Sequence, residues 1–416
     1  MRILHTSDWH LGTWLDTRDK SRLPEQITFI DELCRICEDE KIELVIIAGD
    51  IFDTYVPPAE AEALFYDAME RLCDGGKRCI VAIAGNHDDP QRLTAANPIL
   101  LKHGVIIIGT PNECACDFEN DFISVKSLQK CCFEVHIKKS GETAVVAAMP
   151  YPSEKRLNER LTCDDDTFDE ATLQKNYSEK VGELLGEMAA FFRDETVNII
   201  TGHFYVAGGQ TSAGIERDVS IGGGFAVSPD AIPKNADYIA LGHLHRAQAV
   251  AGTDGRGFYS GSPIAYSLSE INFSKCVYIV DVGCKERPAI VNKQLLSCPK
   301  PIEEWKFNSI EEAIEFCEKN GERNCFAYIT IYSDRPLYQN EIKAMNQAKK
   351  DIIFKDIISL SEEEKNKNLS AEVEEKSIGE EFVDFYKSER GTEPPEEILR
   401  LFGEILNFSA EEGDSE

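Results

Sequence analysis

Side chains that can bind metal ions follow two short apolar segments near the start of this chain. Residues 44–48 lead into Asp50, and residues 80–84 lead into Asn86 and His87, each through a glycine. Carboxylate, amide and imidazole groups together suit borderline divalent ions such as Mn²⁺, Fe²⁺ or Zn²⁺ better than they suit Mg²⁺. We therefore predict a divalent metal site at the ends of these two segments.

Three further apolar segments end in the same residue types. Five of the eight histidines occupy such positions, whereas His5, His103 and His136 do not. One histidine after a strand is usually a hydrogen-bonded structural residue, but a whole set at equivalent positions is typical of a functional site. The set consists of Asp8, His10, Asp50, Asn86, His87, His203, His243 and His245.

The elements that position these side chains are expected to be parallel strands. Continuous runs rich in Val and Ile, such as residues 44–48 and 80–84, are typical of strands buried on both faces. Between them, Pro57 and Pro58 precede apolar residues at helical spacing, which predicts a helix and hence a βαβ unit. Because parallel strands end at the same edge of a sheet, the polar residues that follow them should meet there.

The remaining pattern predicts a mixed α/β chain. A helix is expected over residues 24–40, and a long helix ends near residue 193. The charged segment 155–170 is expected to be a surface loop, and the Gly- and Ser-rich segment 208–224 a functional loop. Further strands are expected at 105–108, 122–125, 132–137, 143–149, 197–201, 238–241, 276–282 and 289–295.

The sequence pattern changes after residue 298. Ser309 and Glu312 have the spacing of a capping box, and the alternation that follows predicts a small α/β unit. Near the end, two short amphipathic helices have apolar faces that need a partner to bury them. We expect a main domain at 1–298, a small α/β domain at 299–360, an acidic linker at 361–376, a helix pair at 377–408 and an acidic tail at 409–416.

The chain is strongly acidic. Its formal net charge is −30, and the segment from residue 361 onward holds 18 acidic and 6 basic residues, a net charge of −12. Such a charge favours solubility and argues against a broad nucleic-acid-binding face on this chain. A basic path for nucleic acid would therefore be local or supplied by a partner.

Cysteine usage and hydropathy point to a cytoplasmic protein. The chain has fourteen cysteines, and its first residues lack the basic and apolar regions of a signal peptide. The pairs Cys34/Cys37, Cys114/Cys116 and Cys131/Cys132 could be zinc ligands, but they are better interpreted as buried or half-buried free thiols. No apolar stretch approaches the length of a membrane span, so no membrane association is expected.

The motif series D-x-H, G-D, G-N-H-D, G-H and G-H-x-H resembles the calcineurin-like metallophosphoesterase superfamily. This resemblance implies an α/β fold with a β-sandwich flanked by helices, and two divalent ions per subunit. Two ions about 3.5–4 Å apart can share a hydroxide nucleophile and clamp a phosphate during in-line displacement. The first ion would be held by Asp8, His10, Asp50 and His245, and the second by Asp50, Asn86, His203 and His243.

The resemblance gives His87 a different role from the ligands. It is expected to hold no metal and to protonate the leaving oxygen or stabilise the charged transition state, as a positioned general acid does. Asp53 and Asp88 are expected either to fix the orientation of the imidazoles or to be solvated carboxylates of a turn. No further cofactor is expected.

Longer stretches narrow the resemblance to the SbcD family of nuclease subunits. They include MRILHTSDWHLG, GDIFDTYVPP, GNHDDPQRL, GGQTSAGIERDVSIGG, ALGHLHRAQ and YSGSPIAYSLSE. The family implies Mn²⁺-dependent 3′→5′ exonuclease action on duplex DNA ends and endonuclease action on single strands and hairpins, in DNA repair, recombination and replication.

The same resemblance implies partners. Members of this family form a homodimer that assembles with two copies of the SbcC ATPase. In this chain, residues 299–360 would be a DNA-facing cap domain, and residues 377–408 would dock on the SbcC coiled coil.

Two other functions fit the same residues. A small-substrate phosphatase or cyclic-nucleotide phosphodiesterase could use this fold, but it would not need the small α/β unit or the terminal helices. A non-catalytic scaffold could also retain the fold, but it would have no reason to keep a complete ligand set together with His87. Hydrolysis of nucleotides without degradation of duplex DNA would favour the first, and absence of bound metal would favour the second.

Overall fold

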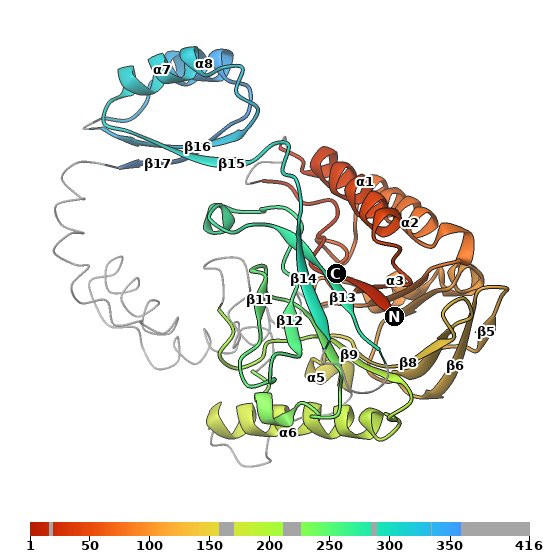
Figure 1. Ribbon diagram of the computed structural model, residues 1–416. Helices are drawn as coiled ribbons and strands as arrows, with labels where there is room; N and C mark the ends of the chain where they lie inside the picture. Colours follow the sequence, from red (N-terminus) through yellow and green to blue (C-terminus); the bar gives the residue numbers. More distant parts are fainter. Residues whose placement is uncertain (16–19, 158–169, 211–225, 284–288, 334, 359–416) are drawn as a thin grey trace. The chain divides into compact units, whose positions relative to one another are not determined.

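A computed structural model describes residues 1–15, 20–157, 170–210, 226–283, 289–333 and 335–358 (Figure 1). The expected linker, helix pair and tail beyond residue 360 lie outside the described residues, as do most of segments 155–170 and 208–224. The chain divides into two units. The first comprises Met1–Glu304 and Glu322–Tyr328, and the second comprises Trp305–Gly321 and Ile329–Glu416.

The first unit contains a six-stranded sheet with the strand order β14-β13-β1-β2-β3-β4. Its four parallel strands are β1 (Arg2–Thr6), β2 (Leu44–Ile47), β3 (Cys79–Ile83) and β4 (Val105–Ile108). The antiparallel strands are β13 (Cys276–Asp281) and β14 (Ile290–Leu295). The helix α2 (Ala59–Leu72) connects β2 to β3, so the βαβ unit expected from the sequence is confirmed.

A second sheet of eight strands has the order β11-β12-β10-β9-β8-β7-β6-β5. Its parallel strands are β8 (Glu142–Met149), β9 (Val197–His203), β10 (Tyr238–Gly242) and β12 (Gly257–Tyr259). The others are β5 (Phe118–Glu119), β6 (Ile123–Gln129), β7 (Cys132–Ile137) and β11 (Gln248–Ala249). The strand expected at 122–125 was too short, because β6 continues to Gln129. Strand β5 was not expected from the sequence.

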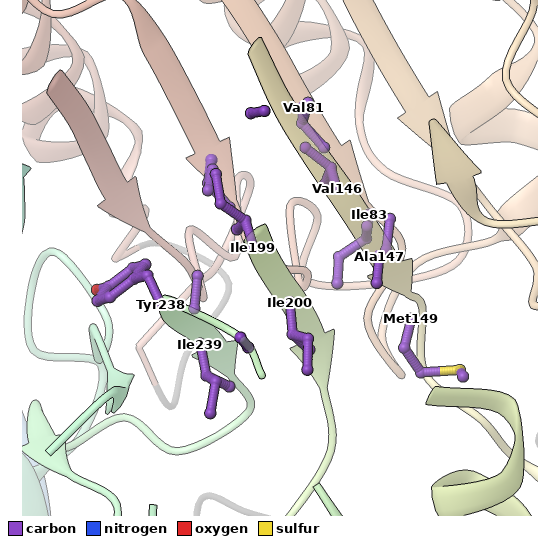
Figure 2. Packing of buried hydrophobic residues seen from close by; sticks show 14 of the residues in the cluster. Val81, Ile83, Val146, Ala147, Met149, Ile199, Ile200, Tyr238 and Ile239 are labelled. Carbon is purple, nitrogen blue, oxygen red and sulfur yellow. The ribbon is translucent and has the colours of Figure 1, made fainter. Parts of the chain in front are cut away.

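The core of the first unit lies between these two sheets. Leu44 and Ile46 of β2 belong to the cluster that also holds the side chains of the second sheet. Their neighbours Val45 and Ile47 point the other way and pack with α1 (Leu23–Asp39) and α2. Figure 2 shows the interior side, where side chains of β3 lie beside those of β8 and β9. The two sheets therefore form a sandwich.

Helices cover the outer faces of this sandwich (Figure 1). The helix α6 (Glu170–Ala189) contributes Tyr177, Val181, Leu185 and Met188 to the core cluster of the second sheet. This covering explains why β9 is buried along its whole length and does not alternate. The predicted fold class, a β-sandwich flanked by helices, is confirmed.

Short helices occupy several connections of the first unit. They are α3 (Pro90–Thr94), α4 (Asn97–Leu100) and α5 (Glu154–Leu157). The sequence predicts a surface loop over residues 155–170, but α5 includes residues 155–157. The start of the predicted loop is therefore wrong. Its charged residues hid the turn of helix, which is too short to show a periodic pattern.

After residue 298 the chain forms the helices α7 (Ile310–Lys319) and α8 (Gln339–Ala348), which belong to the second unit. The three-stranded sheet has the order β15 (Ile302–Phe307), β16 (Phe326–Tyr332) and β17 (Ile352–Ile358), and both helices lie on one face of it (Figure 1). The Ser309 hydroxyl accepts a hydrogen bond from Glu312 N at 3.1 Å, which confirms the predicted helix start. Strand β15 was not expected from the sequence.

The cysteine prediction is partly wrong. Cys37 is buried, as expected, but Cys114 and Cys116 are exposed. In the part of the chain that the structure describes, the cysteines are free thiols. No helix among the described residues is long and apolar enough to cross a membrane.

Candidate metal centre

Five strands, three from the first sheet and two from the second, deliver the predicted site residues to one place. Asp8 and His10 follow β1, Asp50 follows β2, and Asn86 and His87 follow β3. His203 is the last residue of β9, and His243 and His245 follow β10. All eight residues lie at the same rim of the sandwich. The remaining described histidines lie outside this cluster; His5, for example, is bonded to the Tyr238 hydroxyl at 2.8 Å.

Glycines next to the ligands allow the two sheets to approach closely. A Cβ atom added to Gly242 would lie 1.9 Å from the carbonyl oxygen of Ala48, across the sandwich. At Gly85 an added Cβ would lie 2.1 Å from Asp50 Oδ1. Any larger residue at these positions would push the strand ends apart, so the glycines of the G-N-H-D and G-H-x-H motifs are required by this packing.

Several candidate ligands have left-handed backbone conformations. The φ angle is 53° at Asp8, 43° at His10, 49° at Asp50 and 100° at His243. A non-glycine residue held in such a conformation costs about 1–3 kcal/mol and is concentrated at functional sites. Hydrogen bonds hold the strained turns in place, because His10 N donates to the Asp50 carbonyl at 3.0 Å and His243 N donates to Asp8 Oδ1 at 2.9 Å.

One group of ligand atoms is formed by Asp8, His10 and His245. One ligand atom from each of these residues, a carboxylate oxygen or an imidazole nitrogen, lies within 4.8 Å of the other two. All three residues are buried. The Nε2 atoms of His10 and His245 are 3.1 Å apart. Asp50 Oδ2 is 3.6 Å from His10 Nε2 and so lies at the edge of the same group.

A second group lies on the other side of Asp50. His203 Nε2 is 3.3 Å from Asp50 Oδ2 and 3.1 Å from Asn86 Oδ1. The Nδ1 atom of His243 is 3.0 Å from the same amide oxygen. Asp50 Oδ2 is therefore within 3.6 Å of an imidazole nitrogen of each group, which is the position required of a bridging carboxylate.

His87 lies beside the first group. Its Nδ1 is 2.8 Å from the carbonyl oxygen of Asp53, which can only accept, so Nδ1 carries the proton and Nε2 is left for other partners. Its backbone N donates to Asp50 Oδ1 at 2.8 Å, and its ring contacts His10 edge to face at 4.8 Å. The structure also brings ligand atoms of His10, Asp53 and His87 within 4.8 Å of one another.

Burial and the nearby charges move the pKa values of these groups in different directions. Burial lowers the pKa of His243 to about 3 and that of His10 well below its usual value. Burial also lowers the pKa of His203, but the adjacent Asp50 carboxylate outweighs it and raises the pKa to about 9. Burial acts to raise the pKa of Asp50, and the imidazoles of His203 and His87 overcome it, so the pKa lies well below its usual value.

The donor set fits a pair of divalent cations. Two imidazole nitrogens whose lone pairs face each other at 3.1 Å, as in His10 and His245, repel unless a proton or cation lies between them. Ligand nitrogens at about 2.0–2.1 Å from one ion are separated by roughly this distance. Buried carboxylates that face such nitrogens supply the compensating negative charge, so these residues fit a metal site.

The two acidic residues near His87 have different roles. Asp88 is fully buried and accepts hydrogen bonds from the backbone N atoms of Ile51, Phe52 and Gly85 at 2.8–3.1 Å. It ties the loop after β3 to the loop after β2 and does not orient an imidazole, so both interpretations offered for Asp88 are wrong. Asp53 Oδ1 lies 3.7 Å from His10 Nδ1, which is too far for a hydrogen bond, and accepts one from the Thr13 hydroxyl at 3.0 Å.

Sequence reasoning missed three supporting residues. Gln26 of α1 donates to the His10 carbonyl at 2.7 Å and accepts from Gly12 N at 3.0 Å, which clamps the loop after β1. Arg156 of α5 bonds to the loop after β3, and Glu270 bonds to His245. None of them stands at a strand end, so the pattern that revealed the ligands gave no signal for them.

Comparison with known proteins identifies the family. Residues 1–247 match the family model described as calcineurin-like phosphoesterase. The SbcD subunit of the SbcCD nuclease of Bacillus subtilis is 40% identical over 415 residues, which covers 99% of each chain. The chain belongs to the SbcD family of nuclease subunits. It is a hydrolytic phosphodiesterase of the nuclease class, and its fold implies divalent metal binding.

Two further SbcD proteins share a smaller part of the sequence. The SbcD protein of Rhodobacter capsulatus is 33% identical over 307 residues, covering 73% of this chain and 70% of the relative. That of Escherichia coli K12 is 29% identical over 344 residues, covering 76% of each. A solved dimetal phosphatase from Danio rerio is 12% identical and covers 71% of this chain and 96% of that one, with a TM-score of 0.37.

Proposed function

We propose that this SbcD protein is a two-ion DNA nuclease, with Mn²⁺ as the ion. Asp8, His10, Asp50 and His245 would hold the first ion, and Asp50, Asn86, His203 and His243 the second. The observation that carries this assignment is Asp50 Oδ2, which lies 3.6 Å from His10 Nε2 and 3.3 Å from His203 Nε2. When bound, such ions activate water and stabilise the charge of the transferring phosphate.

The protein's own side chains have separate tasks in this proposal. In its doubly protonated form, His87 would donate the Nε2 proton to the leaving oxygen and keep the Nδ1 proton in its bond to the Asp53 carbonyl. That same bond fixes the ring at the edge of the first group, against His10. Asp88 would keep the loop that carries His87 closed over the loop of Asp50.

The substrates would be DNA ends, hairpins and single strands, cleaved by 3′→5′ exonuclease and endonuclease action. The relatives are named as subunits of SbcCD, which supports a partner subunit, SbcC. In this proposal SbcC is an ATPase, two copies of each chain assemble, and this chain pairs with its own copy. A net charge of −30 agrees with a DNA path that belongs largely to the partner. Free thiols agree with a cytoplasmic location.

The regions outside the catalytic domain have roles in the same proposal. Residues 299–360 would form the cap that faces DNA, and residues 377–408 would dock on SbcC. The acidic composition of residues 361–376 suits a linker between these parts.

A nuclease assay tests the proposal. Hairpin DNA, blunt duplex DNA and p-nitrophenyl esters of phosphate would be incubated with the purified chain in Mn²⁺, with and without SbcC and ATP. We expect Mn²⁺-dependent cleavage of DNA, stimulated by SbcC and ATP, and absent from the Asp50→Asn variant. Rapid hydrolysis of the small esters while the DNA substrates stay uncleaved would instead identify a small-substrate phosphoesterase.

A further inference from the structure

A buried charged pair lies at the Nδ1 edge of His245. It consists of Glu270, which is fully buried, and Lys275, which is 8% exposed. Neither residue belongs to the proposed ligand set. Burying two charges is unfavourable unless each is paired and hydrogen-bonded, so a pair in contact with a proposed metal ligand points to a role at that ligand.

The two oxygens of Glu270 face different partners. Oε1 lies 3.3 Å from His245 Nδ1 and accepts a hydrogen bond from Tyr266 N at 3.1 Å. Oε2 accepts from the Ser262 hydroxyl at 2.8 Å and from the Lys275 ammonium group. Both oxygens are therefore acceptors only, and both must remain acceptors for these four donors to be satisfied.

Lys275 also reaches the backbone of the same histidine. Its Nζ donates to the carbonyl oxygen of His245 at 3.3 Å and to Ser262 Oγ at 2.7 Å. Glu270 holds the ring of His245 while Lys275 holds its main chain, and the ion pair joins the two. His245 is thus fixed at both ends by one buried unit.

We propose that Glu270 is a positioning residue for His245, which it holds in the tautomer that directs an unprotonated Nε2 toward the first ion. A carboxylate at Nδ1 requires that this nitrogen carry the proton, so the lone pair stays on Nε2. Nε2 is the atom that lies 3.1 Å from His10 Nε2. The other tautomer would place a proton there and could not bind a cation.

Glu270→Gln tests this proposal because an amide has only one acceptor. Lys275 offers donors alone, so the amide oxygen is expected to face Lys275 and Ser262. The amide NH₂ group would then face His245 Nδ1 and force the proton onto Nε2. We expect the affinity for Mn²⁺ at the first site to fall about 10–100-fold, the usual cost of losing such a support. The second site should keep its affinity.

A double variant separates the tautomer from general damage. In Glu270→Gln with Lys275→Met, the amide oxygen is no longer drawn to an ammonium group and can accept from His245 Nδ1, while NH₂ donates to Ser262 Oγ. The double variant should therefore recover most of the lost Mn²⁺ affinity.

The measurements are Mn²⁺ titration calorimetry and elemental analysis of the full chain, with circular dichroism to verify folding. Glu134→Gln serves as a matched control, because it removes a carboxylate paired with Arg193 at 2.5 Å, remote from the site. Unchanged first-site affinity in Glu270→Gln, or a double variant as weak as the single one, would overturn the proposal.

The inference rests on the proposed two-ion site, and the two can fail separately. If the unmodified chain binds fewer than two ions, the proposed function is wrong. If the unmodified chain binds two ions and Glu270→Gln binds both of them as tightly as the unmodified chain does, only the role of Glu270 is wrong.

Discussion

Arg156 Nη2 donates a hydrogen bond to the carbonyl oxygen of Asp88 at 2.7 Å, which ties a residue that follows the second sheet's strand β8 to a loop of the first sheet. Its Nη1 makes a second bond, also of 2.7 Å, to the carbonyl of Gly85. The two bonds bracket Asn86 and His87. The guanidinium also packs over the ring of Tyr151, which lies 6.1 Å from the ring of His243.

Replacing Arg156 by alanine should free the loop that carries His87. A misplacement of about 1 Å at a reacting group can cost about 10²-fold in rate, so we expect kcat to fall about 10–100-fold with a smaller change in KM. Cleavage of hairpin DNA in Mn²⁺ measures this effect. Arg92→Ala is a matched control, since Arg92 is exposed and pairs with Glu62 instead. Equal losses in both variants would show that charge, and not loop position, is responsible.

Asp50→Asn should lower the occupancy of both ions and abolish cleavage, because the lost charge serves both groups. His10→Ala should mainly weaken the first ion. Elemental analysis after dialysis measures ions per chain. Two ions retained in Asp50→Asn would exclude a bridging role for this carboxylate.

His87→Ala should bind two ions and DNA normally yet cleave very slowly. Removal of a general acid typically lowers the rate about 10²–10⁴-fold. Single-turnover cleavage together with metal analysis tests this. A parallel fall in metal content and activity would mean that His87 is a ligand, in line with its closeness to His10 and Asp53.

Mn²⁺ binding at the second site should strengthen as pH rises. In the metal-free chain, Asp50 raises the pKa of His203 to about 9 against the opposing effect of burial, so His203 is protonated at pH 7. Metal binding must release this proton, which predicts about a tenfold gain in affinity per pH unit between roughly pH 6.5 and 8.5. Calorimetry in buffers of different ionisation enthalpy would detect the proton. An affinity that stays flat across this range would contradict the assignment of His203 as a ligand.

A chain truncated after Leu360 should retain its fold, its ions and its basal Mn²⁺-dependent activity. It should lose association with SbcC and any stimulation by ATP, because residues 377–408 are the proposed docking helices. Full-length protein carrying Phe402→Glu should show the same loss, since the sequence predicts Phe402 on the apolar face of the second of these helices. Co-purification of the truncated chain with SbcC at full affinity would place the docking site elsewhere.

The ligands could be predicted from the sequence because each stands directly after a buried strand. Strand ends such as those before Asp50 and Asn86 are marked by a Val- and Ile-rich run and a glycine, and parallel pairing brings them together. His203 and His243 were harder to connect to them, because they belong to a different sheet. Only the resemblance of the motif order to a known family linked the two halves of the site.

The supporting residues could not be predicted for a physical reason. Glu270, Lys275 and Arg156 act through hydrogen bonds that depend on loop paths, and their own neighbours in the sequence carry no periodic signal. Asp88 follows a metal ligand and so resembled a partner of an imidazole, but backbone N–H groups of the neighbouring loop take its oxygens. Strand β15 was missed because Glu303 and Glu304 interrupt its apolar residues.

Each proposed ion would take ligands from both layers of the sandwich. Asp8, Asp50 and Asn86 come from the first sheet, and His203 and His245 from the second. The ions would therefore cross-link the two sheets, and a ligand that binds only the folded state at about 100 times its Kd stabilises that state by about 2.7 kcal/mol. Metal supply would then govern the lifetime of the protein as well as its chemistry, because metal-starved molecules would open more often at this rim and be degraded first.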